Sequence, residues 1–247
     1  MRSLLLILAL LPLALPAAAQ DDALARGRAA LDAAVLSGSV DSLQMARAQI
    51  QLAASGDHAD WATYYTALTD YRLGYAFWGA QPEQAGQHAA LGASALADLR
   101  RQRLAEPLKA EAAALHSALL GMQIGLDASL GMTLGQTAAQ ATAEANRLAA
   151  DNPRVQFVEA TSLLSTPAEW GGDPDRALAL LQTAVATFEA SGEAATQEAP
   201  TWGHADAAAW LAMAHLMRGE AAPARVALET AEALNPNSDF VRFKLVV

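Results

Sequence analysis

The chain has 247 residues and no cysteine, and 53% of its residues are hydrophobic. Its 16 basic residues stand against 26 acidic ones, which gives a net charge of −10 at pH 7. A chain of this length can bury a sizeable apolar core without disulfide bonds. The acidic balance, with Lys109 and Lys244 as the only lysines, argues against binding to nucleic acid or to anionic membrane surfaces, because both need basic patches.

The N-terminus has the pattern of a secretory signal peptide. Arg2 precedes an apolar run over 4–15, and Ala-Ala-Ala-Gln follows over 17–20, which is the typical order of charge, apolar region and small-residue cleavage site. The apolar run is shorter than the about 20 residues that span a bilayer. We therefore expect a signal peptide over 1–19 and a single mature domain over 20–247. An uncleaved N-terminal anchor is the alternative.

Signal cleavage predicts a periplasmic or secreted protein. The mature chain would carry 15 basic and 26 acidic residues, a net charge of −11. It has no cysteine that could carry a lipid and no second long apolar run. We expect no membrane insertion after cleavage.

Strong helix formers dominate the mature chain, and no segment shows the period-two alternation of a β-strand. The apolar spacing and the Gly and Pro punctuation predict ten helices and a short capping segment at 238–246. The expected helices span 21–37, 40–54, 58–79, 82–103, 106–125, 134–150, 153–165, 174–190, 205–218 and 221–234. Paired in order, they make five helix hairpins in one continuous all-α solenoid.

A fixed spacing of small and apolar residues recurs in the second half of the chain. It falls on Gly219, Ala224, Leu228, Ala231 and Pro236, again on Gly172, Ala177, Leu181 and Ala184, and more weakly on Ala141, Ala145, Leu148 and Pro153. Alanines at these places let two helices approach closely while the leucine fills the gap. The spacing resembles the tetratricopeptide (TPR) repeat, and so predicts an α-α superhelix, a TPR-like solenoid of about five hairpins.

An aromatic stripe occupies one face of the helix expected at 58–79. Its members are Trp61, Tyr64, Leu68, Tyr71, Tyr75 and Trp78, and Tyr65 lies beside it. Spacings of three and four residues place these side chains on one helix face. The stripe is either a wall of a concave binding surface, suited to sugars, peptides or planar groups, or a core packed against neighbouring helices.

Arg154 occupies an unfavourable position for a cation. Asn152 and Pro153 cap and begin a helix, so a positive charge in the first turn opposes the helix dipole by about 0.3–1 kcal/mol. A bound anion or a carboxylate must offset this. A loop acid such as Glu169 is the structural alternative to a ligand.

Two loops place a tryptophan before glycine: Trp170 before Gly171-Gly172, and Trp202 before Gly203. Such a side chain either plugs the end of a helix pair or lines a binding surface. His204 follows the second loop. His-x-Asp pairs occur at 58–60 and 204–206, but a metal site needs three or more convergent ligands, so no metal site is predicted.

The order of three motifs carries a closer resemblance. Asn152-Pro153-Arg154, the loop from Pro167 to Gly171-Gly172, and Pro200-Thr201-Trp202-Gly203 resemble a group of secreted bacterial TPR proteins of undetermined function. The resemblance covers 135–240 well and 57–134 loosely. It implies an α-α superhelix outside the cytoplasm and transfers no catalytic residues. A looser similarity links the chain to the helical T component of TRAP-type transporters.

The chain lacks the familiar catalytic motifs and cysteine nucleophiles, so we expect a binding protein rather than an enzyme, with no cofactor. The leading hypothesis is a scaffold that binds a protein or peptide along its concave face. The alternatives are a small-molecule binder linked to uptake, which uses the aromatic stripe and Arg154, and an enzyme with an unfamiliar site near Arg154 and His204.

Overall fold

The structure is a computed structural model that describes residues 17–190 and 198–238. Within these ranges its regular secondary structure is all helical, as expected, with ten α-helices, two short 3-10 helices and no strand. The α-helices are α1 (Ala17–Ser37), α2 (Val40–Gln51), α3 (Ala59–Phe77), α4 (Pro82–Arg100), α5 (Glu106–Leu126), α6 (Gly131–Ala149), α7 (Pro153–Ser165), α8 (Pro174–Ala190), α9 (His204–Met217) and α10 (Ala221–Leu234).

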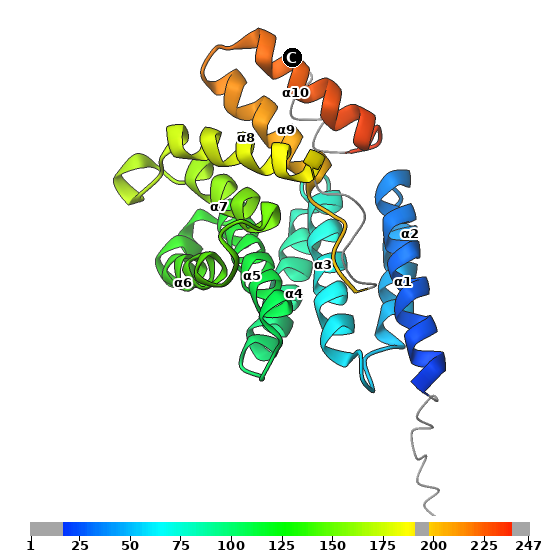
Figure 1. The fold of residues 1–247 in the computed structure, drawn as a ribbon. Helices are drawn as coiled ribbons and strands as arrows, with labels where there is room; N and C mark the ends of the chain where they lie inside the picture. Colours follow the sequence, from blue (N-terminus) through cyan, green and yellow to red (C-terminus); the bar gives the residue numbers. More distant parts are fainter. Residues whose placement is uncertain (1–16, 191–197, 239–247) are drawn as a thin grey trace, which may run out of the picture.

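Consecutive helices pack in pairs, α1 with α2 through to α9 with α10, and neighbouring pairs pack against one another in chain order. This gives the curved helical array of Figure 1. The last pair returns to the first: the side-chain amide of Asn237 donates to the carbonyl of Leu36 at 2.9 Å. The all-α solenoid of five hairpins is therefore confirmed.

The helix starts agree closely with the sequence because they are set locally. Asn152 caps α7 by accepting a hydrogen bond from the backbone N–H of Arg154, and Pro174 begins α8 after Asp173. Residues 17–19 of the predicted signal peptide belong to α1, and its other residues lie outside the described ranges. So does the capping segment predicted at 238–246, apart from Ser238.

The recurring small residues lie where helices touch. Ala177, Leu181 and Ala184 of α8 are fully buried, and Ala224 and Ala231 of α10 are at most 3% exposed. The close packing that the repeat spacing predicts is therefore present. In the part of the chain that the structure describes, no helix is both long and apolar enough to span a membrane.

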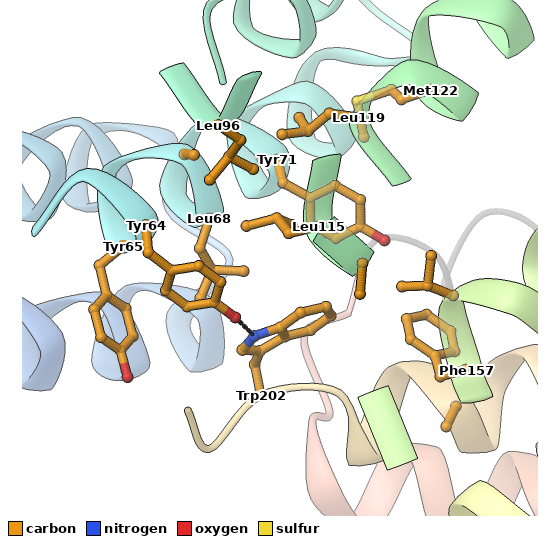
Figure 2. Close-up of a cluster of buried hydrophobic side chains, with 14 of the residues drawn as sticks. Tyr64, Tyr65, Leu68, Tyr71, Leu96, Leu115, Leu119, Met122, Phe157 and Trp202 are labelled. Atoms are coloured by element: carbon orange, nitrogen blue, oxygen red, sulfur yellow. Dashed lines mark hydrogen bonds between the residues drawn. The ribbon is translucent and has the colours of Figure 1, made fainter. Parts of the chain in front are cut away.

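Helix α3 lies in the middle of the array and has the largest aromatic content. It packs against α2, α4 and α5, so most of its surface meets other helices. Figure 2 shows its tyrosines among leucines of α4 and α5, with Trp202 entering from a distant loop. This central helix organises the candidate site.

Candidate functional site

The segment 198–203, which precedes α9, lies against α3 and α1. Tyr65 donates its hydroxyl hydrogen to the carbonyl of Glu198 at 2.8 Å, and Arg28 of α1 donates to the carbonyl of Ala199 at 2.8 Å. Trp202 donates its indole N–H to the hydroxyl of Tyr64 at 2.8 Å. Figure 1 shows the segment, in gold, running beside α3. The protein's own chain thus covers part of the aromatic stripe.

Burial divides the aromatic stripe into a packed middle and half-buried members. Tyr64, Tyr65 and Tyr71 are at most 3% exposed, whereas Trp61, Tyr75 and Trp78 are half-buried. Trp202 packs against Tyr71 with ring centroids 5.9 Å apart. The stripe therefore does not form an open wall along its whole length, because the segment 198–203 and helices α4 and α5 pack over its middle.

The partner of Arg154 is Glu111 of α5. The Nε and NH2 groups of Arg154 contact Glu111 Oε1 at 2.8 and 2.7 Å, and the amide of Asn152 donates to the same oxygen at 2.6 Å. Glu111 Oε2 accepts the hydroxyl hydrogen of Tyr64 at 3.2 Å. The structural ion pair is thus present with a different acid from the proposed Glu169, which lies exposed in the 3-10 turn Ala168–Trp170.

Tyr64 and Glu111, at the centre of this network, are at most 3% exposed, and burial and charge together set the protonation of its members. Burial alone would lower the pKa of Arg154, but the Glu111 carboxylate raises it above the ordinary value. Burial, reinforced by the charge of Glu111, raises the pKa of Tyr64 well above 10. Arg154 therefore stays charged and Tyr64 stays neutral, which makes the network a fixed structural unit.

The two loop tryptophans lie in different environments. Trp202 is 8% exposed and packs against Phe157 of α7 with ring centroids 6.2 Å apart, so it acts as the plug. Trp170 is 70% exposed. The geometry thus distinguishes two loops that look alike in sequence.

His204 and Arg154 both lie against the ring of Phe188. The imidazole of His204 stacks on the Phe188 ring at 5.3 Å, and the Arg154 guanidinium lies 6.0 Å from the ring centroid. Burial lowers the pKa of His204. Arg154 is already bound by Glu111, and within the described residues no group of three metal-ligating side chains occurs.

A half-open cavity of about 70 Å³ lies between the first and last hairpins. Its walls come from α1, α2, α3, α9 and the chain after α10. The lining residues are Ala34, Val35, Gly38, Leu43, Tyr71, Arg72, Tyr75, Ala76, Asp206, Trp210, Asn235, Asn237 and Ser238. Tyr71 and Tyr75 were expected as site residues; Arg72, Asp206 and Trp210 were not.

Arg72 and Asp206 form a paired bridge across this cavity. Arg72 NH1 and NH2 donate to the two carboxylate oxygens of Asp206 at 2.7 and 2.8 Å. The guanidinium also lies 5.6 Å from the ring centroid of Trp202. Burial would lower the pKa of Arg72, but Asp206 raises it. Arg72 is therefore a permanent cation at the cavity.

The two cavity tyrosines are neutral at physiological pH. Burial raises the pKa of both Tyr71 and Tyr75. Their hydroxyl oxygens lie 3.5 Å apart, and the Tyr75 ring stacks on Trp78 with centroids 5.9 Å apart. The cavity thus combines aromatic surface, hydroxyl groups and one cation.

Sequence reasoning could not pair Arg72 with Asp206. The two residues are 134 positions apart, and the array must close before they meet. The available signals were weak: Arg72 follows Tyr71 on the aromatic helix, and Asp206 belongs to a His-x-Asp pair. Neither marks a cavity by itself.

No protein-family model and no curated protein matches the chain. A solved structure, the HusA haemophore from Porphyromonas gingivalis, is similar with a TM-score of 0.64 and 26% sequence identity. The match covers 79% of this chain and 92% of that one. The chain therefore shares its helical fold with a haemophore. The TPR family assignment remains a prediction.

Proposed function

We propose that this protein is exported and binds a small, flat, acidic ligand of the haem class at the cavity between α3 and α9. One observation carries the proposal: a cavity with aromatic walls and a permanent cation, in a fold shared with a haemophore. The signal-peptide pattern at 1–19 agrees with a role outside the cytoplasm.

The chemistry of the lining supports a ligand that is both aromatic and anionic. Tyr75 and Trp210 offer ring surface, and aromatic groups stack favourably in offset or edge-to-face geometries. Arg72 is the only cation among the described lining residues, and a guanidinium matches the planar geometry of a carboxylate. A porphyrin with propionate groups has both features.

The cavity volume indicates how such a ligand would bind. Pockets that enclose a whole ligand measure roughly 300–1,000 Å³, and this cavity is about 70 Å³ and open on one side. We therefore propose that only one edge of a macrocycle enters it. The acidic edge would enter towards Arg72, and the rest of the ring would lie on the outer surface beside Trp210.

The peptide-binding scaffold has less support. The sequence favoured it because of the repeat architecture and the missing catalytic motifs. A peptide on the aromatic stripe would find Tyr64 and Tyr65 already occupied by hydrogen bonds with the segment 198–203. A partner peptide would have to displace that segment. The small-molecule alternative needs no such displacement.

Titration of the purified mature protein with haemin, followed by the Soret absorbance, tests the proposal. We expect a saturable spectral change with the wild-type protein. Trp210→Ala should weaken binding by roughly tenfold through loss of stacking area, a loss of about 1.4 kcal/mol. Trp170→Ala is the matched control, because it removes the same side chain from a site that is 70% exposed and does not line the cavity.

Two outcomes would count against the proposal. A wild-type protein that causes no more Soret change than an unrelated acidic protein does not bind haem. Equal weakening by Trp210→Ala and Trp170→Ala would place the binding elsewhere.

A further inference from the structure

The Arg72–Asp206 pair is unusual because it joins two distant parts of the chain inside the cavity. Arg72 lies on α3 and Asp206 in the first turn of α9. Their side chains are 13% and 23% exposed, so the pair is largely shielded but reachable from the open side. Among the described lining residues they are the only charged groups.

We propose that Asp206 is an internal stand-in for the acidic group of the ligand, which exchanges with it on the guanidinium of Arg72. Arg72 is then the anion anchor, and Asp206 is the residue that determines how strongly an acid is preferred over its neutral ester. This inference rests on the proposed function and adds the group of the ligand that is recognised.

The first argument is the requirement for a counter-charge. A cation in a shielded site is strongly destabilising without an anion, so Arg72 needs a carboxylate in the ligand-free protein. Asp206 supplies it with a two-point contact at 2.7 and 2.8 Å. A ligand carboxylate offers the same planar geometry, so exchange replaces one pair of bonds with an equivalent pair.

The second argument is that the Asp206 carboxylate remains stabilised after it releases Arg72. It lies in the first turn of α9, where unpaired backbone N–H groups and the helix dipole stabilise a negative charge. Its side chain already reaches solvent. Release from Arg72 therefore does not leave the Asp206 carboxylate isolated in an apolar interior.

The third argument is that neutral donors lie beside the anchor. Tyr71 and Tyr75 line the same cavity as Arg72, and burial raises the pKa of both hydroxyls. They remain protonated and can donate hydrogen bonds to an arriving carboxylate. No second cation is needed to hold the acid.

The test compares haemin, which has two free carboxylates, with haemin dimethyl ester, which has none. Wild-type protein should bind the acid more tightly than the ester. Asp206→Asn keeps the side-chain shape but removes the competing charge, so it should bind haemin roughly tenfold more tightly. Its affinity for the ester should change less than about twofold.

The double variant Arg72→Gln with Asp206→Asn is the matched neutral control. It removes both charges and keeps groups that can hydrogen-bond to each other, and it should lose the preference for the acid. Thermal melting of each variant shows whether the fold is retained. If the single variant does not fold, a wild-type acid-to-ester affinity ratio near one still overturns the inference.

Three results would overturn the inference. The first is that the wild-type protein binds the acid and the ester with nearly equal affinity. The second is that Asp206→Asn changes both affinities equally. In either case the proposal that the protein binds haem still stands. The third is a wild-type protein that binds neither compound, which overturns the proposed function as well.

Discussion

Trp202 donates its indole N–H to the hydroxyl of Tyr64 at 2.8 Å, across 138 positions of sequence. The Tyr64 hydroxyl in turn donates a hydrogen bond to Glu111. The two hydrogen bonds, of which Figure 2 shows the one between Trp202 and Tyr64, anchor the segment 198–203 against α3.

Tyr64→Phe should destabilise the protein by about 1–3 kcal/mol, because it leaves the buried indole N–H of Trp202 without an acceptor. The free energy of unfolding from urea denaturation measures this. Tyr75→Phe is the control: its hydroxyl contact with Tyr71 is long, at 3.5 Å, so its loss should be under about 1 kcal/mol. Equal losses of stability in the two variants would show that the Trp202–Tyr64 hydrogen bond contributes no more than the long Tyr71–Tyr75 contact.

Glu111→Gln should cost about 3–5 kcal/mol, because it leaves the buried guanidinium of Arg154 without a counter-charge. Glu169→Gln should change stability by less than about 0.5 kcal/mol, since Glu169 lies exposed on a surface turn. Denaturant unfolding of the two variants compares them directly. A larger loss of stability for Glu169→Gln than for Glu111→Gln would mean that Glu111 is not the acid that stabilises Arg154.

His116 should make the fold sensitive to mild acid. Burial, together with the charge of Arg100, lowers the pKa of His116 from its ordinary value of 6.5 to about 4. Protonation therefore favours the unfolded chain, so the contribution of the neutral imidazole is present above pH 6.5 and is lost as the pH falls towards 4.

Melting temperatures measured between pH 7 and pH 4 check this. His116→Gln should show a shallower decrease over that range than the wild-type protein, because its side chain does not titrate. Parallel curves for the two proteins would contradict the prediction.

Gly172→Ala should lower the free energy of unfolding by several kcal/mol or prevent stable folding altogether. A methyl group at this position would overlap the backbone carbonyl oxygen of Thr166, and backbone atoms cannot move aside as a flexible side chain does. Gly135→Ala is the matched control, because nothing lies within 4 Å of its added methyl group.

Since Gly135 lies inside α6, the control should be stabilising by about 0.5–1 kcal/mol through its higher helix propensity. Soluble yield and melting temperature report both changes. A Gly172→Ala protein as stable as the wild type would show that the turn before α8 is looser than the structure indicates.

The sequence alone was sufficient for the helices and their pairing. Asn152-Pro153 and Asp173-Pro174 mark helix starts through local capping, and Ala177 and Ala184 mark close contacts through their size. These signals act within about one or two helical turns, so no knowledge of the folded chain is needed to interpret them.

Only the tertiary structure decided which side chains meet. Arg154 is bound by Glu111, 43 positions away, and Arg72 by Asp206, 134 positions away. Arg154 meets Glu111 because α7 packs against α5, whereas Arg72 meets Asp206 only when the last hairpin returns to the first. Many acids in the chain could have served equally well by composition. The aromatic stripe was visible in the sequence, but the segment 198–203 determined which of its rings are covered and which line a cavity.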